Sequence, residues 1–122
     1  MIAITAASPD LDAEVDPRFG RAAHLLLVNP KTRKWKSVEN PGRRAGSGAG
    51  IRVAQLLSDH HVEAVISGRF GPKAQEALER AGIGMCSCDG RCSVAEAIDL
   101  WKSGKLAPGQ RSNRLTYLSG RR

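Results

Sequence analysis

The chain has 122 residues, which is enough for one domain with a hydrophobic core and too few for two. Apolar residues make up 41%, charged residues 25% and aromatic residues only 4%, so the core must be built from aliphatic side chains. The sequence has no apolar run near the roughly 20 residues of a transmembrane helix and no signal-peptide pattern, so we expect a cytoplasmic protein. The net charge of +7 favours an anionic partner, such as a nucleic acid, an acidic protein or a polyanionic ligand.

The hydrophobic pattern predicts strands and helices in the order βββαβαβα. Strands are expected at residues 1–6, 22–28, 34–39, 62–66 and 83–85. Helices are expected at residues 49–59, from Pro72 to the stop at Gly82, and after Ser93, where Ser93-Val94-Ala95-Glu96 forms a capping box. Three strands in a meander, followed by strands that alternate with helices, indicate one mixed sheet whose later strands are parallel and covered by helices.

The three cysteines, Cys86, Cys88 and Cys92, lie within seven residues. An odd count at this spacing is not a disulfide framework, and clustered thiols in a reducing cytosol more often indicate metal or redox chemistry. Thiolates favour iron–sulfur clusters, Zn²⁺ or Cu(I). Three ligands are one short of a structural zinc site, and the spacing is not that of a ferredoxin. Metal ligation, a reduced loop without metal and redox sensing therefore all stay open.

Several short motifs, in this order, resemble the dinitrogenase iron–molybdenum cofactor biosynthesis family. They are Arg-Phe-Gly-Arg-Ala at residues 18–22, Gly-Ala-Gly at 48–50, Ser-Gly-Arg-Phe-Gly-Pro-Lys-Ala at 67–74, Ala-Gly-Ile at 81–83, Val-Ala-Glu-Ala-Ile at 94–98 and Gly-Lys-Leu at 104–106. The family includes carriers of the nitrogenase cofactor and its precursors. It also includes the orange proteins of sulfate reducers, which look like holders of a mixed molybdenum–copper sulfide cluster.

The resemblance implies a ribonuclease-H-like α/β fold with a five-stranded mixed sheet in the order 3-2-1-4-5. It covers residues 1–106, which we expect to form the metal–sulfur cluster-binding domain, and leaves residues 107–122 as a basic, loosely ordered tail. It implies a non-catalytic carrier whose ligand is an anionic cluster, either an iron–sulfur or iron–molybdenum precursor or a molybdenum–copper sulfide. A protein that delivers or accepts the cluster would be a further partner, and we expect no membrane partner.

The chain departs from the family in two places. Members often carry His immediately before the Phe-Gly pair, and this chain has Arg18 there, which shifts the loop from imidazole ligation towards charge pairing. The segment at residues 86–92 that contains the cysteines is not a feature that we associate with the family as a whole.

In a sheet of this order, ligands bind outside the carboxyl ends of the parallel strands, where residues 7–21, 67–71 and 86–92 form loops. Helix N-termini at the same edge favour anions. The predicted cofactor-binding residues are the arginines, the glycines and one phenylalanine of this edge: Arg18, Phe19, Gly20, Arg21, Gly48, Gly50, Gly68, Arg69, Gly71 and Arg91. Candidate metal ligands are Cys86, Cys88, Cys92 and His24, although a histidine in a strand is more often structural.

Other functions have weaker support in the sequence. A nuclease needs several carboxylates that hold Mg²⁺, and the first strand has none. The stretch Gly-Ser-Gly-Ala-Gly at residues 46–50 lacks the Lys-Ser/Thr of a phosphate-binding P-loop. The main alternative is a regulatory or scaffold protein that binds nucleic acid or an acidic protein through its basic hairpin and tail. Few aromatic residues are available there to stack on bases, which argues against nucleic acid as a partner.

Overall fold

The computed structural model describes residues 1–88 and 92–108. Its strands are β1 (Ile2–Ala6), β2 (His24–Val28), β3 (Trp35–Glu39), β4 (Ala64–Ser67), β5 (Gly84–Ser87) and β6 (Ala107–Pro108). Its helices are α1 (Ala49–Asp59), α2 (Pro72–Arg80) and α3 (Val94–Lys102). None of these helices is long and apolar enough to cross a membrane.

The strands form one mixed sheet in the order β3-β2-β1-β4-β5-β6. β1 pairs with β4 and β4 with β5 in parallel, whereas β2 and β3 form an antiparallel hairpin beside β1. The predicted α/β fold and the strand order 3-2-1-4-5 are therefore confirmed. The last predicted strand extends further than expected, because Cys86 and Ser87 continue the pairing with β4 instead of starting a loop.

β6 is a strand that the sequence analysis did not predict. Its two residues pair antiparallel with β5, so the sheet includes the first two residues of the segment assigned to the tail. Pro108 is tolerated there because an edge strand has one side where no N–H donor is needed. Residues 109–122, and with them most of the predicted tail, lie outside the described residues.

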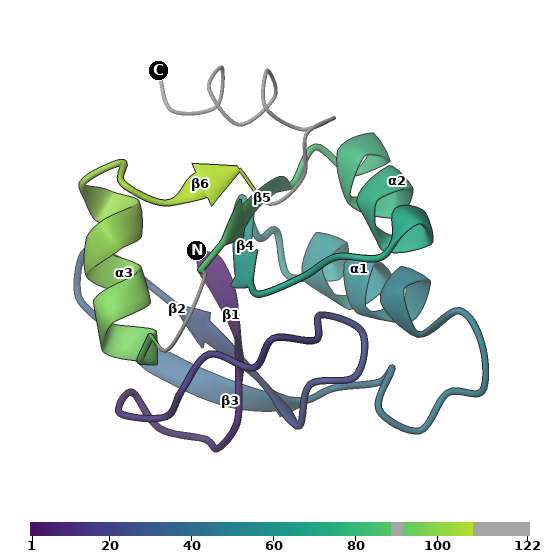
Figure 1. Ribbon diagram of the computed structural model, residues 1–122, viewed down its shortest axis with the longest axis horizontal. Coiled ribbons are helices and arrows are strands. Elements are labelled where there is room, and N and C mark those ends of the chain that lie inside the picture. Colours follow the sequence, from purple (N-terminus) through teal and green to yellow (C-terminus); the bar gives the residue numbers. More distant parts are fainter. Residues whose placement is uncertain (89–91, 109–122) are drawn as a thin grey trace.

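The two faces of the sheet carry two separate hydrophobic clusters, and helices cover both faces (Figure 1). Helices α1 and α2 cover one face, where Ala3, Leu25 and Val65 point, and α3 covers the other, where Ile2, Ile4 and Ile66 point. Side chains alternate between faces along a strand, which is why β1 supplies both clusters. Both faces are buried at β1 and β2, as is usual for strands with near-continuous apolar runs, whereas β3 at the edge is largely exposed.

Candidate functional site

The carboxyl ends of β1 and β4, where the sequence analysis expected a ligand, are filled by the chain itself. The Thr5 hydroxyl lies 2.7 Å from the Asp16 carbonyl oxygen and 2.8 Å from the Ser67 hydroxyl, and all three residues are buried. At Gly68, a Cβ added to the backbone would stand 2.6 Å from the Pro17 Cα. The loop between β1 and β2 therefore packs into the crevice and closes it.

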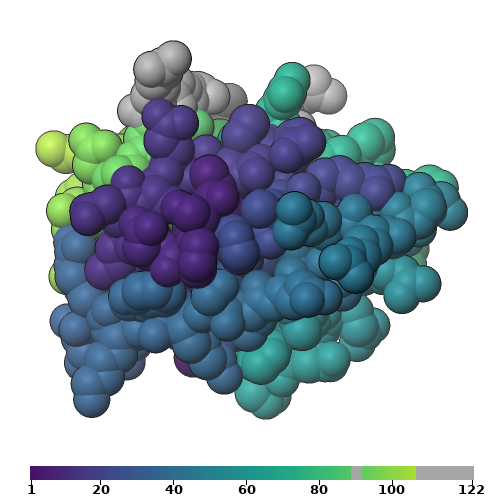
Figure 2. All heavy atoms as spheres, turned by 90° about the horizontal axis from the view of Figure 1, so that it is seen from below, coloured from purple at the N-terminus to yellow at the C-terminus, as the bar shows by residue number. Residues whose placement is uncertain are grey.

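A cavity of about 400 Å³ lies instead where the N-termini of α1 and α2 meet. Five of the predicted cofactor-binding residues line it: Gly20, Arg21, Gly48, Gly50 and Gly71. They come from the β1–β2 loop, the connector before α1, the first turn of α1 and the β4–α2 loop. Figure 2 views the loop edge from below and shows the first of these segments, in purple, beside the connector, in blue.

The two helix N-termini at this cavity favour a negative charge. Gly48 is the N-cap of α1 and Gly71 that of α2, and in the described chain neither cap donates or accepts a side-chain hydrogen bond. The first turns of α1 and α2 also contain no acidic residue, so the N–H groups and dipoles there are not neutralised locally. Gly48 has a φ of 73°, a left-handed conformation that a residue with a Cβ adopts only with strain. A helix N-terminus of this kind binds anions readily.

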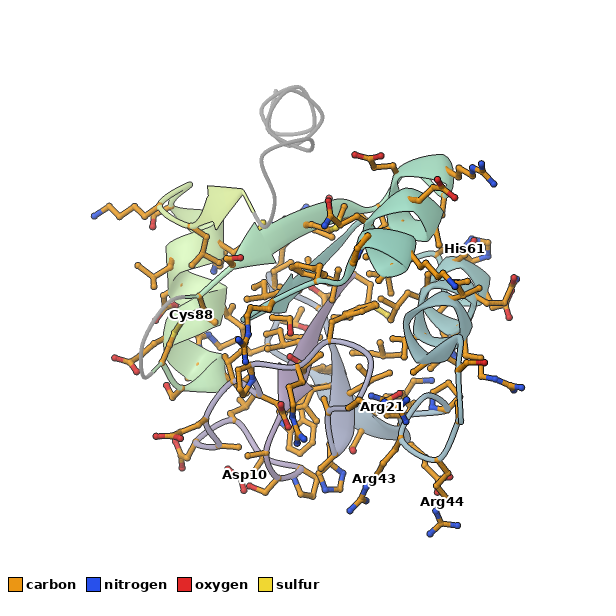
Figure 3. All side chains as sticks on the ribbon, turned by 45° about the vertical axis from the view of Figure 1, so that its right-hand side comes forward. Asp10, Arg21, Arg43, Arg44, His61 and Cys88 are labelled. Carbon is orange, nitrogen blue, oxygen red and sulfur yellow. A yellow bond between two sulfur atoms is a disulfide. The ribbon has the colours of Figure 1, made fainter. Side chains whose placement is uncertain are left out.

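Arg21 anchors the connector that forms one wall of the cavity. Its guanidinium donates hydrogen bonds to the carbonyl oxygens of Ala45 at 2.5 Å and Gly46 at 3.0 Å, with a longer one to Gly42. The sequence analysis missed this contact, because the partners lie more than 20 positions along the chain. Arg43 and Arg44 on the same connector lie near Arg21 at one corner of the molecule (Figure 3).

At three of the glycines predicted to bind the cofactor, the space that a Cβ would take is limited by other residues of the chain. A Cβ at Gly50 would be 2.7 Å from the Ala74 Cβ, and one at Gly20 would be 3.1 Å from the Gly50 nitrogen. At Gly68, Pro17 occupies the space that a Cβ would need. At Gly71, by contrast, a Cβ would have no described heavy atom within 4 Å. Gly20, Gly50 and Gly68 thus allow backbone segments of this chain to approach one another, and Gly71 borders the space that a ligand could enter.

The remaining predicted residues of the β1–β2 and β4–α2 loops lie outside the cavity lining. Phe19 is buried and contacts Phe70, with ring centroids 5.2 Å apart, so it joins the two loops and is not available to a ligand. The backbones of Arg18 and Arg69 form an isolated parallel β-bridge between the two loops, and both residues are exposed. The Arg18 side chain is 3.4 Å from the buried carboxylate of Asp16.

The structure does not place the three cysteines as one ligand set. Cys88 and Cys92 form a disulfide, and Cys86 is fully buried in β5. All three belong to the hydrophobic cluster under α3, on the opposite face of the sheet from α1 and α2. Among the described residues, no group of three or more His, Cys, Asp and Glu side chains could hold a metal ion. The sequence argument against a disulfide framework did not anticipate this single Cys88–Cys92 bond.

Two other predicted residues contribute nothing to the cavity. His24 is half-buried at the start of β2, opposite Ala6 and Glu39 of the neighbouring strands, and does not line the cavity. Arg91 lies outside the described residues. In the basic hairpin that motivated the alternative function, Arg33 forms an ion pair with Asp99 of α3.

The sequence analysis did not name Lys73 and Ile51 as site residues, although both line the cavity. Both are exposed, and each lies in the first turn of its helix. The signal for Lys73 was present, since Pro72 marks a helix start and the next residue must lie beside the first free N–H groups.

Comparison with known proteins identifies one family and several solved structures. A sequence profile described as dinitrogenase iron-molybdenum cofactor matches residues 1–104. An uncharacterized protein of Methanocaldococcus jannaschii is 30% identical over 103 residues, which are 82% of this chain and 86% of the relative.

Two solved structures resemble the fold and share part of the sequence. The apo form of the orange protein from Desulfovibrio gigas has a TM-score of 0.83 and 37% identity, covering 88% of this chain and 90% of that one. A protein from Thermotoga, proposed to be NifB and assigned to the DUF35 family, has a TM-score of 0.75 and 31% identity with the same coverage, 88% and 90%.

Proposed function

We propose, from the premise that this chain belongs to the dinitrogenase iron-molybdenum cofactor family, that it is a carrier for an anionic metal–sulfur cluster. The family prediction is confirmed, and it relates the chain to the handling of an iron–molybdenum cofactor. The similarity to the orange protein supports the carrier role further. The cluster that we propose is an iron–molybdenum-type precursor or a molybdenum–copper sulfide, and it is cargo that another protein would deliver or accept.

The observation that carries the proposal is the cavity between the N-termini of α1 and α2. Its walls combine the N-termini of two helices that have no side-chain cap within the described chain, the guanidinium of Arg21 and the ammonium-bearing side chain of Lys73. A sulfide cluster spreads its negative charge over many sulfur atoms, and each of them can accept a hydrogen bond from such donors. The cavity of about 400 Å³ offers room for a ligand larger than a single small ion.

Binding without catalysis is part of the proposal, and the sequence at the sheet supports it. β1 and β4 contain no carboxylate, whereas hydrolytic chemistry on this type of fold needs several to hold metal ions. The polar side chains at the ends of these strands, Thr5 and Ser67, are occupied by hydrogen bonds to each other and to Asp16.

Titration of the purified protein with tetrathiomolybdate, followed by charge-transfer absorption, tests the proposal. We expect saturable binding that weakens as ionic strength rises, because exposed charge pairs are screened by salt. Lys73→Gln should weaken binding about two- to fivefold, the effect of one exposed charge pair. The matched control is Lys102→Gln, which removes the same charge from the last turn of α3 and should leave binding unchanged.

Two results would contradict the proposal in different ways. No absorption change at millimolar ligand would exclude the carrier function. Equal losses in the Lys73 and Lys102 variants would show that binding follows the net charge of the protein and not the cavity.

A further inference from the structure

The Cys88–Cys92 disulfide joins two points that hold the loops leading to the cavity. On one side, the Cys88 N–H donates to the Ser67 carbonyl oxygen at 3.1 Å, and the Ser87 hydroxyl donates to the Gly68 carbonyl oxygen at 3.2 Å. These contacts hold the start of the β4–α2 loop, which ends at Gly71 on the cavity wall.

On the other side, Cys92 holds the β1–β2 loop, which contributes Gly20 and Arg21 to the same cavity wall. The Cys92 carbonyl oxygen accepts a hydrogen bond from the Val15 N–H at 2.8 Å, and the Val94 N–H donates to the Ala13 carbonyl oxygen at 2.8 Å. An isolated bridge between Glu14 and Ser93 adds to this contact. Cys88 and Cys92 are thus each attached to a different loop.

The β1–β2 loop and the β4–α2 loop are also hydrogen-bonded directly to each other. The Arg69 N–H donates to the Pro17 carbonyl oxygen at 2.8 Å, and the Phe19 N–H donates to the Arg69 carbonyl oxygen at 3.2 Å. The rings of Phe19 and Phe70 are in contact beside these bonds. The β1–β2 loop, the β4–α2 loop and the residues around the disulfide therefore contact one another. The disulfide is the covalent bond within the third of these segments.

We propose that this disulfide is a reversible redox clasp, whose reduction loosens the two loops and lowers the affinity of the cavity for its anion. The effect on affinity rests on the proposed function, whereas the effect on the loops does not. The disulfide closes a short loop, with a sequence separation of 4, so it adds less to global stability than a bridge across a long loop would. Its consequence is local because both cysteines belong to segments that contact other loops.

Reduction requires an external dithiol, either a small molecule such as dithiothreitol or a protein with a Cys-X-X-Cys pair. A thiolate of this dithiol attacks one sulfur of the Cys88–Cys92 bond, which breaks as a mixed disulfide forms. The second thiol of the reagent then displaces that cysteine, so two electrons and two protons pass to the protein and the reagent becomes the disulfide. Cys88 and Cys92 are each only 7% exposed, so the reaction should take minutes to hours without a catalyst.

The test compares the oxidised full chain with the chain treated with dithiothreitol and then desalted under anaerobic conditions. Maleimide labelling after denaturation should count one thiol before reduction and three after it, since Cys86 is outside the disulfide. Amide hydrogen exchange should become faster at Val15, Phe19 and Arg69 in the reduced form. The amide of Leu57 should not change, because it lies near the C-terminal end of α1, away from the first turn that contacts Gly20.

The affinity of both forms is measured with tetrathiotungstate, and the maleimide count is repeated after the titration to show that the ligand has not itself opened the disulfide. We expect the reduced form to bind about five- to tenfold more weakly, at the low end of couplings between sites. The double variant Cys88→Ser/Cys92→Ser should behave as the reduced form under both conditions. The control Cys86→Ser keeps the disulfide and should keep the difference.

Equal exchange rates in the oxidised and reduced forms would contradict the proposed loosening of the loops. Three free thiols that persist after treatment with an oxidant would show that the disulfide does not form. Equal affinities with different exchange rates would overturn its effect on the cavity and leave the carrier function standing. Different exchange rates without tetrathiotungstate binding to either form would leave the clasp standing and exclude the proposed function.

Discussion

Gly50 lies where the first turns of α1 and α2 touch, and the absence of a Cβ there lets the two helices approach. The Cβ of Ala74 occupies the space that a side chain at position 50 would need. Gly42 has a similar role in the connector, where a Cβ would lie 2.7 Å from the Ala49 carbonyl oxygen. These residues shape the cavity through packing, because they determine how closely its walls approach.

Gly50→Ala should therefore destabilise the protein, in spite of the better helix propensity of alanine. We expect a loss of about 1–3 kcal/mol in the free energy of unfolding, which is the usual cost of overpacking a close contact. Urea denaturation followed by circular dichroism measures this value. Gly46→Ala is the matched control: it has open space around it in the described chain and should change stability by less than about 1 kcal/mol. Equal effects of the two substitutions would show that the contact with Ala74 relaxes at no cost.

At the scale of elements, the N-termini of the three helices differ in a way that matches their roles. α3 begins with a complete capping box, in which the Ser93 hydroxyl accepts a hydrogen bond from the Glu96 N–H and the Glu96 carboxylate accepts one from the Ser93 N–H. α1 and α2 begin at glycines without such caps within the described chain. The capped helix thus satisfies its N-terminal donors internally, and the two uncapped helices present theirs at the cavity.

Ser93→Ala should remove part of this cap and lower the free energy of unfolding by about 1 kcal/mol. Thermal or urea denaturation measures the change, and tetrathiomolybdate affinity should stay nearly the same because α3 does not line the cavity. Ser47→Ala, at an exposed position in the connector, is the control and should be within about 0.5 kcal/mol of the natural protein. If Ser93→Ala were as stable as this control, the capping box would contribute nothing measurable.

At the scale of the whole molecule, the sheet separates the proposed binding site from the cysteines. The cavity lies at the α1 and α2 side, and the cysteines belong to the cluster under α3. Any effect of the thiols on the cavity must therefore pass through the loops at the sheet edge. The expected basic tail, residues 107–122, begins with β6, the edge strand next to β5.

Truncation after Pro108 tests whether the tail belongs to the binding function. It removes four arginines, Arg111, Arg114, Arg121 and Arg122. We expect tetrathiomolybdate affinity to change by less than about twofold at roughly 0.15 M salt, where the general attraction of the ligand to the net charge of the protein is largely screened. A large loss would assign the tail to the site. Binding of nucleic acid by the full chain that disappears on truncation, measured by electrophoretic mobility shift, would favour the alternative function.

The sequence alone determined the order of the elements, the strand arrangement through the family resemblance, and the starts of α2 and α3. These features depend on residues within about four positions of one another, such as the pair Ser93 and Glu96, or on a hydrophobic period that is visible along the chain. The same local signals placed five of the cavity residues correctly at the loop edge. Local patterns did not predict every element, since β6 has only two residues and therefore almost no hydrophobic pattern.

Only the tertiary structure decided which part of the loop edge is open. Thr5 and Ser67 are 62 positions apart, and their contact with the backbone of Asp16 closes the crevice that the strand order suggested. Arg21 donates hydrogen bonds to carbonyl groups 21 to 25 positions away, which holds the connector against the β1–β2 loop as a wall of the cavity. Such contacts depend on how distant segments pack together, and no local pattern of residues specifies that packing.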